Sequence, residues 1–237
     1  AISTGLVGSE MCIRDRWENT LFLFCADNGA CPFERTRRPD LKPWDPKSYW
    51  TYDASWAHAG NTPFRLYKQN QHEGGISSPL IAHWPAGLKA KAGSITHQPG
   101  HLIDFMATFL EVAGAKYPKQ MGDRTIDPLM GKSLLPILQG KKREGHETMY
   151  FHFGTDRALR QGKWKLVSAK LGRWELYDME SDRAEMKDLA KRHPDRVKTM
   201  AAKWFDLAKN TERLKGRHLN PVKPVLTKLN FRKDIFK

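Results

Sequence analysis

The stretch LFLFCADNG, residues 21–29, decides the fold of this chain. Its first six residues are apolar, and Asp27, Asn28 and a glycine follow at once. Such a run predicts a central parallel strand that is covered on both faces. Open α/β sheets bind their ligands beyond the carboxyl ends of such strands. We therefore expect Asp27 and Asn28 to lie at the ligand-binding edge of an α/β sheet.

The side chains at this predicted edge suit a metal ion. Asp27 offers carboxylate oxygens and Asn28 an amide oxygen, and such hard donors favour Ca²⁺ or Mg²⁺ over a soft metal. The alternative is an Asn-Gly turn with an Asp cap, because such turns are common. The residues that follow favour the metal site.

A second segment, NTPFRLYKQNQHEGGI at residues 61–76, leads into PLIAHWP at residues 79–85. In this order and spacing, DNG, TPFRLYKQNQHEGG and PLIAHWP resemble the carboxyl-terminal half of the type I sulfatases. These enzymes form the formylglycine-dependent arylsulfatase family of the alkaline-phosphatase superfamily. The resemblance extends from about Glu18 to about Asn210, and further stretches agree with it: residues 102–104, 111–114, 131–136, 160–166 and 175–178.

The resemblance implies roles for individual residues. Asp27 and Asn28 would be two ligands of the catalytic divalent cation, most often Ca²⁺, and Lys68 would contact the sulfate as a catalytic and substrate-binding residue. A fixed divalent ion and a fixed ammonium group stabilise the negative charge that develops when a sulfate ester is displaced. Outside this motif, Lys68 would be read as a solvated surface lysine.

Two neighbouring features of the second segment are less decided. His72 either reaches the substrate or leaving group, or packs beside the turn, and both readings stay open. The stretch Glu73-Gly74-Gly75 predicts a turn back towards the sheet, in which the glycines permit backbone angles that other residues resist.

The family's nucleophile does not occur in this chain. It is a formylglycine made from the cysteine of a Cys-x-Pro-x-Arg motif, whereas CPFER at residues 31–35 places proline directly after cysteine. The resemblance implies that this modification and the other metal ligands, which are acidic, lie outside the chain. We therefore expect the carboxyl-terminal part of a sulfuric ester hydrolase, inactive alone, whose whole enzyme cleaves sulfate esters of carbohydrate or aryl alcohols.

The domain organisation follows from the resemblance and from composition. Residues 1–16 match nothing in the family and predict a non-native leader, with a native surface loop as the alternative. Residues 17–146 are expected to form part of an alkaline-phosphatase-like mixed α/β sheet. Residues 147–210 predict a small antiparallel sheet with a helix, and residues 211–237 a basic tail.

Periodicity predicts individual elements in both parts. Apolar residues recur at helical spacing over 101–113, and Gly114 follows as a stop signal. Short alternating strands are predicted at 149–153, 157–160, 164–168 and 174–178. A helix over 194–209 begins at Pro194 and should pack on this sheet through one apolar face: Val197, Met200, Ala201, Trp204, Phe205 and Ala208.

An aromatic-rich segment, residues 34–59, precedes the second motif. Its aromatic side chains can stack on a sugar or cover core, and we favour core: Trp44, Tyr49, Trp50, Tyr52 and Trp56. Cys12 lies in the leader. Cys25 and Cys31 can pair, but we favour a buried strand thiol and a loop thiol.

The formal net charge is +14, and residues 209–237 hold nine basic and two acidic residues, a net charge of +7. This tail is either solvated or attracted to polyanions such as sulfated polysaccharides. It lacks the interleaved aromatic residues of single-strand binders, so we expect no nucleic-acid partner. No apolar run approaches the ~20 residues of a membrane helix, so we expect no membrane partner. By analogy with the family, we expect a periplasmic or extracellular location.

Two other functions remain open. A phosphodiester or phosphonate monoester hydrolase of the same superfamily would act on a similar tetrahedral oxyanion, although TPFRLYK and HEGG favour sulfate. A non-catalytic polyanion-binding protein is the other alternative, and only the basic tail favours it. The sequence does not indicate which sulfated molecule is the substrate, nor the oligomeric state.

Overall fold

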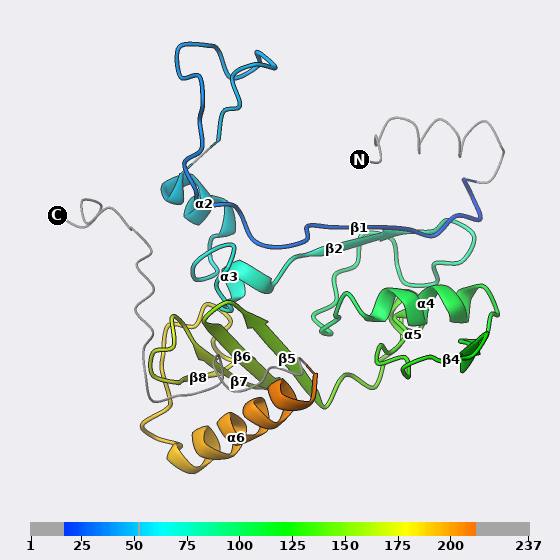
Figure 1. Ribbon diagram of the computed structural model, residues 1–237. Coiled ribbons are helices and arrows are strands. Elements are labelled where there is room, and N and C mark those ends of the chain that lie inside the picture. Colours follow the sequence, from blue (N-terminus) through cyan, green and yellow to red (C-terminus); the bar gives the residue numbers. More distant parts are fainter. Residues whose placement is uncertain (1–16, 52, 212–237) are drawn as a thin grey trace. The chain divides into compact units, whose positions relative to one another are not determined.

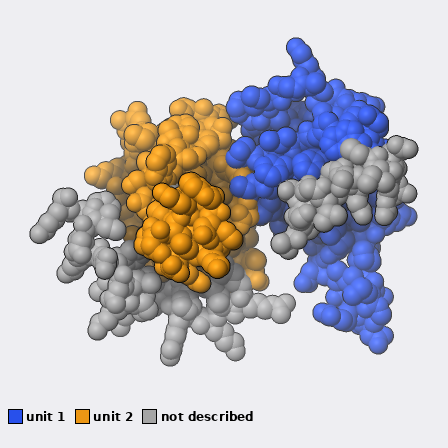
Figure 2. Space-filling model, turned by 90° about the horizontal axis from the view of Figure 1, so that it is seen from above, with its two compact units in different colours: residues 1–26, 79–147 blue, residues 27–78, 148–237 orange. Residues whose placement is uncertain are grey.

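The computed structural model describes residues 17–51 and 53–211 (Figure 1). The predicted leader, Cys12, Tyr52 and the tail beyond residue 211 lie outside the described residues. The chain divides into two compact units. Unit 1 comprises residues 1–26 and 79–147, and unit 2 comprises residues 27–78 and 148–237, so neither is continuous in sequence (Figure 2).

Unit 1 contains the strand that was predicted from residues 21–26. β1 (Phe22–Cys25) pairs with β2 (Leu80–His83), and Phe22 lies opposite His83. The predicted parallel strand covered on both faces is wrong in two respects. The pair is antiparallel, and Phe22 and Phe24 on one face of β1 are exposed. β1 has one paired neighbour among the described residues, and an antiparallel pair can leave one face open to solvent.

The predicted helix of unit 1 is confirmed as α4 (Asp104–Val112), which is followed by Gly114 at a φ of 63°. Its polar residues Asp104 and Thr108 are buried. Apolar residues on and before the helix are exposed instead: Leu102, Ile103, Met106 and Phe109. Unit 1 also contains the hairpin β3 (Gln120–Met121) and β4 (Arg124–Thr125) and the short helix α5 (Leu135–Leu138).

Asp104 is buried because polar groups surround it. Arg143 Nη2 donates to one carboxylate oxygen at 2.9 Å, and His146 Nε2 lies 2.6 Å from the other. The backbone N–H groups of His101 and Lys132 also donate to this carboxylate. Burial opposes ionisation of Asp104, but these hydrogen bonds prevail and lower its pKa. The cluster joins α4 to the segments before and after it.

Unit 2 is built on a four-stranded antiparallel sheet in the order β5-β6-β7-β8 (Figure 1). The strands are β5 (Thr148–Phe153), β6 (Asp156–Gln161), β7 (Trp164–Ser168) and β8 (Glu175–Asp178). α6 (Pro194–Thr211) packs on the sheet. All four predicted strands and the helix are confirmed, because alternation and helical periodicity are strong where one face of an element is buried.

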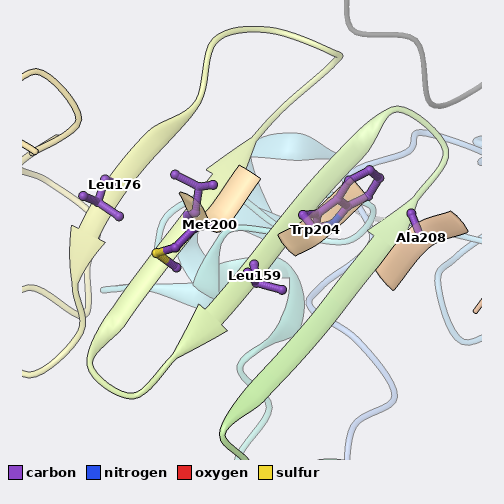
Figure 3. Packing of buried hydrophobic residues seen from close by; sticks show 6 residues of the cluster. Leu159, Leu176, Met200, Trp204 and Ala208 are labelled. Carbon is purple, nitrogen blue, oxygen red and sulfur yellow. The ribbon is translucent and has the colours of Figure 1, made fainter. Parts of the chain in front are cut away.

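The core of unit 2 lies between this helix and the sheet. Met200, Trp204 and Ala208 of α6 lie against Leu159 and Leu176 (Figure 3). The rest of the predicted apolar face packs around this cluster: Val197, Ala201 and Phe205. Trp204 is fully buried, and its indole N–H donates to the carbonyl of Phe151. The helix is therefore fixed to the sheet by apolar packing and by this partly buried hydrogen bond.

The aromatic-rich segment forms a loop and then α2 (Ala54–Asn61), whose N-cap is Asp53. The expectation that its aromatic residues cover core is wrong. Trp44 is 80% exposed and Trp56 71% exposed, and Tyr49 and Trp50 are exposed as well. Among the described residues, these four side chains are therefore left largely open to solvent.

The second motif ends in the short helix α3 (Glu73–Ile76), at the position where a turn was predicted. Cys25 and Cys31 are free thiols, so the alternative of a disulfide between them is not formed. Cys25 is half-buried, less than the buried thiol that we favoured. Within residues 17–51 and 53–211, no helix has the length and apolar character needed to cross a membrane.

Candidate functional site

The structure brings the two sequence motifs together within unit 2. The chain bends at residues 27–29, directly after β1. At the end of this bend, Gly29 N donates to Gly75 O at 3.0 Å, and Lys68 N donates to Ala30 O at 3.1 Å. Ala30 N also donates to the side-chain oxygen of Asn61 at 3.2 Å. The backbone after Asp27 and Asn28 is therefore hydrogen-bonded to the loop that carries Lys68.

Glycine is required where these segments meet. A Cβ on Gly29 would overlap the carbonyl oxygen of Gly74 and lie 3.1 Å from the Cα of Gly75. A Cβ on Gly74 would likewise overlap the carbonyl oxygen of Leu66. Neither Gly74 nor Gly75 has a positive φ. Our expectation that these glycines supply unusual backbone angles is therefore wrong, because their role is to let two backbones approach closely.

The loop that carries Lys68 has an unusual backbone conformation. Leu66 has a φ of 63° and Gln69 a φ of 75°, so left-handed residues stand on both sides of Tyr67 and Lys68. Bulky residues avoid this region, and such outliers cluster at functional sites. Hydrogen bonds hold the conformation, since Asn61 Nδ2 donates to Leu66 O and Asn70 Nδ2 donates to Tyr67 O. Lys68 itself is half-buried.

Asp27 is exposed and Asn28 half-buried. Within the described part of the chain, no group of three or more His, Cys, Asp or Glu side chains is arranged to hold a metal ion. Ca²⁺ takes six to eight oxygen ligands, whereas these two residues offer a carboxylate and an amide oxygen. Their chemistry fits a hard divalent cation, and they would be part of a shell that needs further ligands. Their roles and that of Lys68 stay predictions.

His72 is buried and lies on a polar network. Its Nε2 is 3.2 Å from Glu175 Oε2, and the same oxygen accepts hydrogen bonds from Tyr177 at 2.6 Å and Arg65 at 2.8 Å. Burial lowers the pKa of His72 to about 4, although the hydrogen bond to Glu175 acts in the opposite direction. A neutral His72 donates from Nε2, and its Nδ1 is then a buried acceptor that has no partner within residues 17–51 and 53–211.

The environment of Glu175 favours its ionised form. Burial opposes its ionisation, but hydrogen bonds from Tyr177 and His72 and the nearby Arg65 lower its pKa. Glu175 borders an open pocket of about 340 Å³, which is also lined by Arg173, Met186 and Asp188. His72 is therefore buried against Glu175 of β8, and its contact with a substrate stays a prediction.

A second polar group surrounds Glu73, the residue that follows His72. Lys165 Nζ is 2.7 Å from Glu73 Oε1 and 2.8 Å from Glu185 Oε1, and all three side chains are buried. Glu185 Oε2 also accepts the backbone N–H of Glu73 at 2.8 Å. Burial opposes ionisation of Glu73, but Lys165 prevails and lowers its pKa. Burial raises the pKa of Glu185, although the attraction of Lys165 acts in the opposite direction.

Sequence reasoning missed both polar groups. The available signal was Lys165 itself, a charged residue inside the apolar strand WKLV at residues 164–167. A lysine enclosed in such a strand needs a buried partner. Its partners could not be named, because Glu73 lies 92 residues away in sequence.

Comparison with known proteins places the chain in a family. The family described as N-sulphoglucosamine sulphohydrolase, C-terminal, matches residues 64–215. An uncharacterized sulfatase of Schizosaccharomyces pombe is 30% identical over 211 residues, which is 79% of this chain and 37% of that protein. The N-acetylgalactosamine-6-sulfatase of Canis lupus familiaris is 31% identical over 148 residues, 62% of this chain and 23% of that protein.

Solved structures agree in fold. Ps i-CgsB matches with a TM-score of 0.64 at 21% identity, over 90% of this chain and 42% of that one. The phosphonate monoester hydrolase of Agrobacterium radiobacter matches with a TM-score of 0.54 at 17% identity, over 87% of this chain and 38% of that one.

The chain thus spans well under half the length of these relatives. The matched structures confirm the expected alkaline-phosphatase-like α/β fold with a small antiparallel sheet and helix. The family match covers more than half of the chain and includes both the Lys68 motif and the four-stranded sheet. The chain belongs to the N-sulphoglucosamine sulphohydrolase C-terminal family, and with it to the sulfatases of the alkaline-phosphatase superfamily.

Proposed function

We propose that the whole protein containing this chain hydrolyses sulfate esters of carbohydrate or aryl alcohols. The observation that carries the proposal is the pair of backbone hydrogen bonds between the two motifs, Lys68 N to Ala30 O and Gly29 N to Gly75 O. They keep the segment after Asp27 and Asn28 beside the loop of Lys68. Two oxygen ligands for a cation then lie on backbone that adjoins a lysine. This arrangement suits the binding of one small anionic group.

In this proposal Lys68 contacts the sulfate. Its ammonium group is a compact charge with three donors, and it stabilises the negative charge that grows on the sulfate oxygens during displacement. The hydrogen bonds from Asn61 and Asn70 hold the loop in one conformation, so Lys68 requires little reorganisation as charge develops. His72 supports the loop through its contact with Glu175. Alternatively, its Nδ1 accepts a hydrogen bond from the substrate.

Asp27 and Asn28 would hold a divalent cation, Ca²⁺ or in the alternative Mg²⁺. Such an ion supplies Lewis-acid stabilisation of the sulfate oxygens when it is bound. Sulfatases generally use a metal ion and a formylglycine, and we propose that the modified residue and the remaining acidic ligands lie upstream of this chain. This chain alone would then be inactive, and the location would be periplasmic or extracellular.

The substrate class rests on related proteins. Curated relatives include N-acetylgalactosamine-6-sulfatase and steryl-sulfatase, and one matched structure contains D-glucosamine-2-N,6-O-disulfate. A sulfated glycan is therefore the substrate that we propose to test first. Hydrolysis of a phosphonate monoester is the second candidate, favoured by the structural match to an enzyme of that activity. Binding of polyanions by the basic tail remains a separate alternative that lies outside the described residues.

The deciding experiment measures turnover by the full-length enzyme on an aryl sulfate, a sulfated glycan and an aryl phosphonate monoester. Sulfate esters should be hydrolysed with the higher kcat/KM, EGTA should abolish turnover, and added Ca²⁺ should restore it. Lys47→Ala, which changes an exposed lysine, serves as the control for Lys68→Ala. A preference for the phosphonate would select the second candidate, and full activity of Lys68→Ala would overturn the assignment of that residue.

A further inference from the structure

The loop that carries Lys68 is fastened to the four-stranded sheet at both ends. At its start, Arg65 Nη1 donates to Glu175 Oε2 at 2.8 Å and lies 2.7 Å from the hydroxyl of Tyr177, both on β8. At its end, Glu73 accepts a hydrogen bond from Lys165 of β7 at 2.7 Å. Lys68 lies between these two anchors. The sheet therefore supports the loop at two separate points.

The second anchor is enclosed and specific in its geometry. The side chains of Lys165, Glu73 and Glu185 are 1%, 4% and 0% exposed. Glu185 also accepts the backbone N–H of Glu73, so both the side chain and the backbone at this point are held. Charges buried in this way interact strongly, and removing Lys165 would take its ion-pair partner from both Glu73 and Glu185. The loop end would then have to move towards solvent.

Close backbone contacts connect the anchors to the two motifs. Gly74 lies directly against Leu66, and Gly75 O accepts the N–H of Gly29. The backbone N–H of Lys68 is bonded to Ala30 O in turn. A shift at Glu73 would thus displace both Lys68 and the segment that follows Asp27 and Asn28, because close-packed backbones move together.

We infer that Lys165 and Glu175 are positioning residues, which hold Lys68 in register with the segment after Asp27 and Asn28. They act through Glu73 and Arg65 and touch no reacting atom. The inference rests on the proposed function for its catalytic consequence, whereas its structural consequence can be measured on this chain alone. The small antiparallel sheet thus helps to orient the candidate site.

The first test is hydrogen exchange of the chain with Lys165→Met. The amides of residues 27–30 and 65–75 should lose protection, while those of α6 keep it. The matched control is Lys163→Met, which removes an ion pair with Asp178 that is 43% exposed at the lysine. The control should leave all these amides unchanged. If Lys165→Met does not fold, Glu175→Gln, which keeps size and shape, should expose residues 65–75 in the same way.

The second test is kinetic and uses the full-length enzyme. Displacing catalytic groups by about 1 Å costs roughly 100-fold in rate. We therefore expect kcat to fall about 10- to 100-fold in Lys165→Met and Glu175→Gln, with KM little changed, and Lys165→Arg to retain more activity than Lys165→Met. Unchanged exchange and unchanged kcat in both variants would overturn the inference. Full activity of Lys68→Ala would instead overturn the role of Lys68 in the proposed function, and the exchange result would still decide the anchoring.

Discussion

The close approach of Gly29 to the second motif gives a sharp prediction, because the added group in Gly29→Ala meets only backbone. The new Cβ would overlap the carbonyl oxygen of Gly74, 2.9 Å from its carbon and 3.1 Å from the Cα of Gly75. No side chain can rotate away to relieve this overlap. The two backbone segments must therefore separate.

The cost can be estimated from the contacts that separation would lose. The hydrogen bond from Gly29 N to Gly75 O, 3.0 Å long, contributes about 0.5–1.5 kcal/mol. Overpacking at a close contact costs about 1–3 kcal/mol. The lower entropy of alanine in the unfolded chain returns about 0.4–1 kcal/mol. We expect Gly29→Ala to lower the free energy of unfolding by about 1–3 kcal/mol, or to detach residues 27–30 from the loop.

Urea unfolding followed by circular dichroism, together with hydrogen exchange at residues 27–30 and 65–75, measures both outcomes. The control is Gly60→Ala in α2, where an added Cβ meets nothing within 4 Å. That variant should be stabilised by roughly 0.5–1 kcal/mol, because alanine favours a helix over glycine. The reasoning is refuted if Gly29→Ala matches the unchanged protein in both unfolding midpoint and amide protection.

Three further predictions concern separate residues. Burial lowers the folded-state pKa of His72 to about 4, below its usual 6.5, so its contribution to stability is complete above pH 6.5 and is lost as pH falls towards 4. The free energy of unfolding should fall by about 3 kcal/mol over this pH range. Urea unfolding at several pH values should show this fall in the unchanged protein and a smaller one in His72→Phe. Trp204→Ala, in the core of unit 2, should cost about 3–5 kcal/mol in the same assay, whereas Trp44→Ala, at a site 80% exposed, should stay within about 0.5 kcal/mol. In the full-length enzyme, Lys68→Ala and Asp27→Ala should each lower kcat about 100-fold or more without lowering the thermal midpoint, and near-normal turnover would contradict their roles.

Prediction from the sequence succeeded best in unit 2. The strands β5 to β8 and the face of α6 that contains Met200 and Trp204 were identified correctly. Each of these elements buries one side, so its own residues record the alternation or the helical period. The turn residues between them are local as well, and neighbouring antiparallel strands need only short connections.

Prediction failed where a residue's environment depends on distant parts of the chain. The run of apolar residues at β1 does not reveal whether its neighbour is parallel or how much of it is covered, and Phe24 is 55% exposed. The apolar pattern around α4 indicated a helix but not which side is buried, and Asp104 faces inward. Periodicity defines an element and leaves its partners open.

The candidate site divides in the same way. The sequence by itself determined the family, the order of the motifs and the residues of chemical interest, Asp27, Asn28, Lys68 and His72, because motif residues and spacing are properties of the chain. Only the tertiary structure decided that Gly29 contacts Gly74, that His72 is buried against Glu175, and that Lys165 joins Glu73 to Glu185. His72 and Glu175 are 103 residues apart in sequence. Contacts at such separation form only in the folded chain, where buried charges meet and glycines let backbones pack closely.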